Sequence, residues 1–93
     1  MSDRKIHFYE GERKEVTATV RSKTSNEVVV ITSSTFEVTR VRDNTVVQKG
    51  TCEISGNEAT ALLEINQKGV LELKITACVG REVVIEKAEI KVM

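Results

Sequence analysis

Apolar and polar residues alternate with a period of two along most of this chain. Leu71, Leu73, Ile75 and Ala77, for example, are separated by single polar residues. No segment shows the three- and four-residue spacing of an amphipathic helix over ten or more positions. The alternation therefore predicts strands at about residues 5–9, 15–21, 27–32, 35–41, 46–55, 58–65, 70–79 and 82–92.

The composition agrees with a chain of strands. Val, Ile and Thr make up 31 of the 93 residues, and their branched side chains suit a pleated sheet better than a helix. Seven or eight short strands with frequent turns are typical of an antiparallel two-sheet sandwich. We expect a single all-β domain over residues 1–93, in which residues 66–69 cross between the sheets.

Glycine-containing turns predict two hairpins and their registers. A two-residue turn at Gly80-Arg81 places Ala77 opposite Val84 and Leu71 opposite Ile90, so that the apolar residues of both strands share one face. By the same rule, a turn at Gly56-Asn57 predicts three further pairs, which are Ile54 with Ala59, Cys52 with Ala61 and Gly50 with Leu63.

The turn around Asp43-Asn44 requires a different length. A two-residue loop there sets Val38 opposite Lys49 and puts apolar and polar residues on the same face. A loop of three or five residues with a bulge restores the match, with Phe36 opposite Cys52 and Val38 opposite Gly50.

One stretch of the chain is similar to a known family. Residues 68–92 read Lys-Gly-Val-Leu-Glu-Leu-Lys-Ile-Thr-Ala…Gly-Arg…Lys-Ala-Glu-Ile-Lys-Val, which resembles the last hairpin of bacterial immunoglobulin-like domains. Leu71 stands where that pattern has a tyrosine. The layout is also similar to small immunoglobulin-like proteins that phages and prophages encode among their tail and head accessory genes. The resemblance implies an immunoglobulin-like sandwich with a structural or protein-binding role, and it implies no catalytic residue.

Charge and motif content exclude several other functions. Fourteen basic side chains balance 14 acidic ones, whereas binding to nucleic acid relies on an excess of Lys and Arg. A small basic patch could form where Arg40 and Arg42 lie across a hairpin from Lys49, but we interpret these residues as a solvated strand end. No apolar run suits a membrane helix or a signal peptide. The sequence thus predicts no nucleic-acid or membrane partner, and a cytoplasmic or virion location.

Catalytic, metal and cofactor motifs are missing as well. His7 is the single histidine, and the glycines are scattered rather than clustered in a phosphate-binding loop. By strand parity Cys52 faces inward and Cys78 outward, so both are expected to be free thiols. Asp43-Asn44 is interpreted as a turn and not as a cation site. We expect no enzyme activity, no metal and no cofactor.

The last hairpin supplies the one candidate site. Near its turn the outward side carries Cys78, Val79, Val83 and Ile85, an apolar group that predicts a contact with another protein or a second copy. The alternative is a bulge near Glu86 that rotates Val83 and Ile85 into the core and spares the carboxylate an inward position.

A second apolar segment, Val28–Ile31, is either a strand covered on both sides or an edge that seeks a partner. The sequence thus favours a non-catalytic structural or protein-interaction module that binds protein partners, with self-association as one form. The alternative hypothesis is a module that recognises a glycan or small molecule through its loops.

Overall fold

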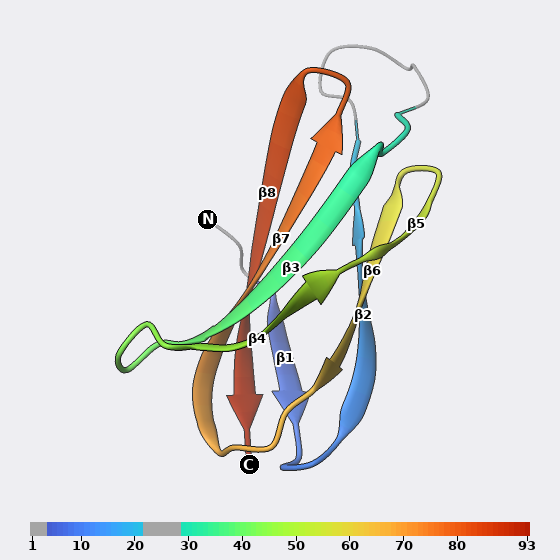
Figure 1. Ribbon diagram of the computed structural model, residues 1–93. Coiled ribbons are helices and arrows are strands. Elements are labelled where there is room, and N and C mark those ends of the chain that lie inside the picture. Colours follow the sequence, from blue (N-terminus) through green and yellow to red (C-terminus); the bar gives the residue numbers. More distant parts are fainter. Residues whose placement is uncertain (1–3, 22–28) are drawn as a thin grey trace.

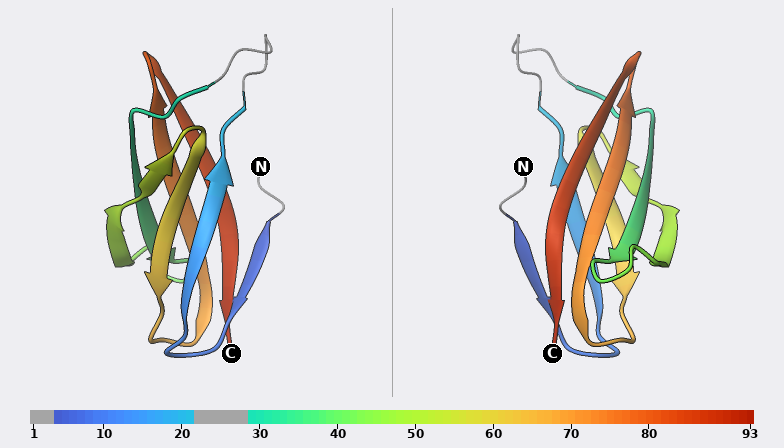
Figure 2. Two further views of the ribbon diagram at one scale, coloured as in Figure 1. Left: turned by 90° about the vertical axis from the view of Figure 1, so that its right-hand side faces the viewer. Right: turned by 90° about the vertical axis from the view of Figure 1, so that its left-hand side faces the viewer.

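A computed structural model describes residues 4–21 and 29–93. In this part of the chain the fold is all-β, and two sheets pack face to face (Figures 1 and 2). The larger sheet has the order β1-β8-β7-β3-β4 and the smaller one the order β2-β6-β5. The strands are β1 (Lys5–Phe8), β2 (Arg13–Thr19), β3 (Ser33–Arg40), β4 (Val46–Thr51), β5 (Glu53–Ser55), β6 (Glu58–Glu64), β7 (Gly69–Val79) and β8 (Glu82–Val92).

The core lies between the sheets and is built from alternate residues of their strands. From the larger sheet it takes Phe8, Phe36 and the inner residues of β7 and β8, and from the smaller sheet mainly alanine and leucine of β6. Several of the large side chains, such as Phe8, Leu71 and Leu73, are at most 1% exposed. The two-residue period predicted from the sequence is therefore the period of burial.

The hairpin β7–β8 has the predicted register throughout. Ala77 lies opposite Val84 and Leu71 opposite Ile90, and Gly80 in the turn has a φ of 59°, which glycine adopts without a steric penalty. The hairpin extends beyond the β5–β6 turn, so the smaller sheet covers only part of it (Figures 1 and 2).

The predicted strand 46–55 is two strands that belong to different sheets. β4 pairs with β3 in the larger sheet, and β5 pairs with β6 in the smaller sheet. The chain changes sheet at Cys52, whose backbone N–H donates to Ser34 O at 3.0 Å. The pair Ile54–Ala59 is confirmed, but the predicted pairs Cys52–Ala61 and Gly50–Leu63 are wrong because the chain has left β6 by then.

Five residues separate β3 from β4, and the register shifts between Val38 and Thr39, as expected for a five-residue loop with a bulge. The pairing itself is displaced by two residues, because Phe36 lies opposite Gly50 and Val38 opposite Gln48. The prediction that Phe36 meets Cys52 is wrong. The glycine fits here because its missing side chain leaves room for the Phe36 ring.

The predicted strand 27–32 falls partly outside the described residues. Where it is described, from Val29 to Thr32, it is not a strand. Instead, Ile31 N–H donates to Gly56 O at 2.9 Å and Thr32 N–H to Cys78 O at 2.8 Å. This segment therefore ties the smaller sheet to the larger one, and only Ile31 is buried in the core.

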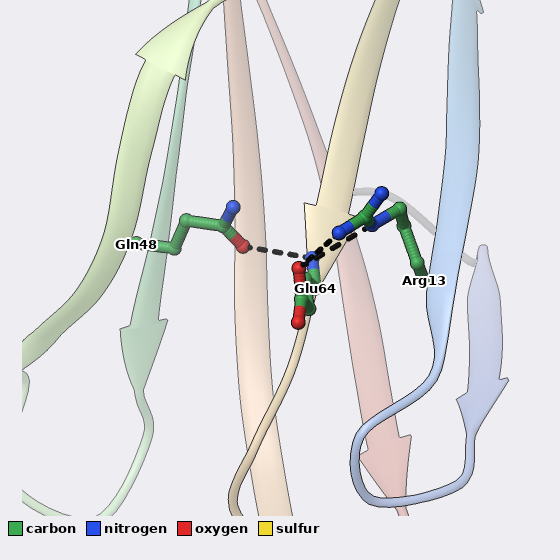
Figure 3. Close-up of polar contacts among 3 residues, drawn as sticks. All are labelled: Arg13, Gln48 and Glu64. Atoms are coloured by element: carbon green, nitrogen blue, oxygen red, sulfur yellow. Dashed lines mark hydrogen bonds and ion pairs between the residues drawn. The ribbon is translucent and has the colours of Figure 1, made fainter.

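Polar contacts also join the two sheets at their sides. Gln48 of β4 reaches across to the smaller sheet, where its Oε1 accepts a hydrogen bond from Glu64 N–H at 3.2 Å (Figure 3). The carboxylate of the same Glu64 forms an ion pair with Arg13 at 2.9 Å, and this contact lies within the smaller sheet, on its outer side. On the opposite side of the molecule, Arg4 Nη1 donates to Thr17 O at 2.8 Å.

Candidate protein interface

Val83 and Ile85 lie on the outer face of the larger sheet, the side turned away from the smaller sheet. Their side chains are 61% and 54% exposed. The β7–β8 register continues without a shift through Thr76–Ile85 and Ile75–Glu86, so the proposed bulge near Glu86 is wrong. Glu86 points to the inner side but is exposed, because it lies on the part of β8 that β1 does not cover at the edge of the sheet.

The other two predicted interface residues differ from each other. Cys78 lies opposite Val83 and shares the outer face, where it is half-buried. Val79 is also half-buried but packs against the core, so its placement on the outer face is wrong. Successive residues of a strand point to opposite sides, and the parity of Ala77 applies to Val79.

The outer face near the hairpin tip is uncharged over three further strands. Ser33 and Thr35 of β3 lie beside Cys78 and Thr76 of β7, and Thr51 of β4 lies beside Thr35. We call this group the uncharged patch, and it consists of Ser33, Thr35, Thr51, Thr76, Cys78, Val83 and Ile85. The β3 and β4 members of the patch were not predictable from local sequence, because the pairing of β3 with β7 joins residues about 40 positions apart.

Below the patch the outer face is charged. One row holds Lys74 opposite Lys87, and the next holds Glu72 opposite Glu89. At the far end lie Val70, 41% exposed, and Val41, 54% exposed, whose backbone N–H donates to Val70 O at 3.3 Å. A groove on this face has Val41, Val70, Glu72, Ile85, Lys87 and Glu89 among its lining residues.

Part of the β8 edge has no strand beside it among the described residues. Glu89 N–H donates to Arg4 O and Met93 N–H to Phe8 O, so the odd-numbered residues of β8 direct their peptide groups toward β1. Because β1 pairs only with Glu89–Val92, the edge from Glu82 to Lys87 is open in the described chain. An open edge is a template for pairing with another strand, and inward-pointing charges such as Glu86 oppose that pairing.

Both cysteines are free thiols. Cys52 is 5% exposed, and burial raises the pKa of its thiol, an effect that a hydrogen bond with Ser34 partly offsets. Because the thiolate is the reactive form, Cys52 behaves as a small core residue. Its inward direction and the outward direction of Cys78 agree with the sequence analysis.

The remaining polar residues singled out in the sequence do not converge on one site. His7 lies on the outer face opposite Lys91. Arg40 is held by Gln67 Oε1 at 3.0 Å and by Asp43 Oδ2 at 3.1 Å, while Lys49 lies opposite Glu37. Within residues 4–21 and 29–93, no three His, Cys, Asp or Glu side chains are grouped as metal ligands.

The Asp43-Asn44 segment is a turn stabilised by its own polar groups. Asn44 has a φ of 60°, a left-handed conformation that asparagine tolerates. Thr45 N–H donates to Asp43 Oδ1 at 3.1 Å. Hydrogen bonds from the hydroxyl and amide of Thr45, with the nearby Arg40 charge, lower the pKa of the Asp43 carboxyl.

Comparisons with known proteins support the fold alone. No family model matches the chain, and no curated protein matches it. Among solved structures, it is similar to the crystal structure of an engineered protein, with a TM-score of 0.74, 16% sequence identity and 97% of this chain covered. The chain corresponds to only 18% of the length of that protein. In the described part of the chain, no helix is long and apolar enough to span a membrane.

Proposed function

We propose that this chain is an immunoglobulin-like domain that serves as a non-catalytic protein-interaction module, of the kind that phages and prophages encode among their virion accessory proteins. Its contact surface is the uncharged patch. The supporting observation is the unbroken β7–β8 register, which exposes Val83 and Ile85 beside hydroxyl residues of three strands.

The strand order supports the immunoglobulin-like assignment. In immunoglobulin sandwiches, strands B, E and D form one sheet and strands G, F and C the other, to which variable-type domains add C′. The order β2-β6-β5 facing β8-β7-β3-β4 has the same connectivity. The virion assignment rests on the similarity of the chain's layout to the small immunoglobulin-like proteins that phages and prophages encode among their tail and head accessory genes.

The chemistry of the patch suits contact with protein. The centres of protein interfaces are depleted in charged residues, because a charge that loses water there without a partner is costly. Charged residues make up 30% of this chain, yet none of the seven patch positions carries one. The hydroxyl groups of Ser33, Thr35 and Thr76 keep such a face hydrated in the free protein and lose water at a smaller cost.

The proposal is tested with the double variant Val83→Asp/Ile85→Asp. Leu62→Asp is the matched control, because Leu62 is 51% exposed but lies on the outer side of the smaller sheet. Circular dichroism melting establishes that each variant folds. Light scattering across a wide concentration range reports self-association, protein capture with mass spectrometry reports other protein partners, and a glycan array reports sugar binding.

Protein contact that persists in Leu62→Asp and is lost in the folded double variant supports the proposal. The proposal is overturned if the double variant keeps all protein contacts. It is also overturned if the wild type binds only glycans and this binding survives the changes at Val83 and Ile85, which favours a module that recognises ligands through its loops.

A further inference from the structure

On the outer face of the β7–β8 hairpin, a 180° rotation about an axis that runs across the strands exchanges the positions of a lysine row and a glutamate row. The lysine row, Lys74 with Lys87, and the glutamate row, Glu72 with Glu89, lie one residue to either side of the pair Leu73–Ala88. Further out, the exposed apolar residues Val83 and Ile85 lie at the tip, and Val41 and Val70 lie at the opposite end, where Lys91 is opposite Val70.

We infer that the partner of this face is a second copy of the chain, packed face to face and antiparallel about a two-fold axis that passes over Leu73 and Ala88. This inference rests on the proposed function and specifies its partner. An isologous interface must be complementary to itself. In this arrangement Lys74 faces Glu72 of the second copy and Lys87 faces its Glu89.

The two ends of the face meet in the same arrangement. The row of Thr76 and Ile85 lies three residues from the centre of the hairpin, as does the row of Val70 and Lys91. Each copy therefore places Thr76 over Val70 of the other and Ile85 over its Lys91, whose aliphatic stem covers an apolar residue while the ammonium group stays in water. Packed sheets cross at about 30° and lie about 10 Å apart, which lets side chains from both copies interdigitate.

The size of the face indicates a dimer that dissociates on dilution. The strands β7 and β8 have 11 residues each, which corresponds to a length of about 36 Å, and the three strands β3, β7 and β8 span about 14 Å. Each copy then contributes about 500 Å². The total of about 1,000 Å² is at the low end of specific interfaces.

The face is a better contact than the neighbouring open edge. Antiparallel edge-to-edge pairing of β8 with β8 of a second copy, centred on Ile85, places Glu86 of each copy opposite Val84 and diagonal to Glu86 of the other on the inner side, where the like charges are within reach and repel. Face-to-face packing leaves Glu86 in water. It also uses both charged rows, which edge pairing leaves exposed.

Charge reversal with mixing tests this geometry. The variant Lys74→Glu/Lys87→Glu makes both charged rows of the face acidic, and Glu72→Lys/Glu89→Lys makes both basic. Each variant alone should dimerise about tenfold or more weakly than the wild type, because its rows repel those of an identical copy. An equimolar mixture should restore the dimer, and added salt should weaken that mixed dimer.

The measurement is molar mass by light scattering behind a sizing column, in reference to the monomer mass of 10.3 kDa. Circular dichroism checks folding, and if a double variant does not fold, the exposed single changes Lys87→Glu and Glu89→Lys replace it. A monomer at all wild-type concentrations overturns the second copy as the partner. So does association of each reversed variant at wild-type strength, which indicates edge pairing or another surface.

A mixture that stays monomeric after both reversed variants have lost association overturns the antiparallel geometry. The proposed function has a separate outcome. It survives each of these failures if a different protein binds the wild type and not the folded variant Val83→Asp/Ile85→Asp.

Discussion

Ile85→Ala measures how much of the association comes from the exposed apolar tip. The side chain of Ile85 is 54% exposed in the single chain. Complete burial of an isoleucine contributes about 1.5–3 kcal/mol, so about half of that, roughly 0.8–1.5 kcal/mol, is left to be gained when a partner covers it. A two-fold axis repeats the contact, and the dimer should lose about 1.5–3 kcal/mol. The dissociation constant should therefore rise by roughly 10- to 150-fold.

The assay compares Ile85→Ala with Leu62→Ala. Leu62 has nearly the same exposure, 51%, but lies on the outer side of the smaller sheet, beside the ion pair of Arg13 and Glu64. Dilution series analysed by sedimentation equilibrium give the dissociation constants, and urea unfolding gives the stability of each monomer. Both substitutions should lower monomer stability by similar amounts, about 1.5 kcal/mol or less, because both side chains are about half-buried in the monomer, and only Ile85→Ala should weaken the dimer.

Two results refute this reasoning. If Ile85→Ala associates like the wild type, the tip is not buried in the dimer. If Leu62→Ala weakens association as much as Ile85→Ala, the loss reflects general surface hydrophobicity and not the outer face of the larger sheet.

Two further substitutions test the monomer. The lowered pKa of Asp43 implies a stabilisation that is present above its unfolded pKa near 3.8 and is lost as the pH falls through the folded pKa. Urea unfolding should therefore show that Asp43→Asn is less stable than the wild type near neutral pH and equally stable in strong acid. A stability difference that does not depend on pH contradicts this. A Cβ on Gly50 lies 3.0 Å from Phe36 Cε1, so Gly50→Ala should cost about 1 kcal/mol or more through overpacking. The cost should shrink in a Phe36→Leu background, and an equal cost in both backgrounds shows that the Phe36 ring is not its cause.

Local signals made part of the fold predictable. A tight turn fixes the register of the two strands it joins, and for this reason the pairing on both sides of Gly80 could be derived residue by residue. The exposure of Val83 and Ile85 follows from that register. The sequence alone left it open, because an inward Glu86 has a high cost only if it is buried, and whether this part of β8 is a sheet edge is a property of the whole fold.

Non-local pairing explains what the sequence did not reveal. Residues 46–55 alternate like one strand, and nothing in that pattern marks Cys52 as the place where the chain changes sheet. The alternation is preserved because both halves bury one face in the same core. The β3 and β4 members of the uncharged patch escaped prediction for the same reason, since their neighbours on the face come from β7.

The outer face supports an interaction role through contrast with the smaller sheet. There, polar outward side chains pair among themselves, as Arg13 does with Glu64 and Thr17 with Thr60, each at 2.9 Å, and Leu62 is the exposed apolar residue between them. On the larger sheet, Lys74 faces Lys87 and Glu72 faces Glu89 directly across the hairpin. Glu37 of β3 lies on the other side of Lys74, and Lys5 of β1 lies on the other side of Glu89. Glu72, which lies beside Thr39, and Lys87 at the open part of the β8 edge have no opposite charge directly across among the described residues, and a second copy supplies one to each. The balanced net charge of the chain therefore permits a surface whose electrostatics are completed between molecules.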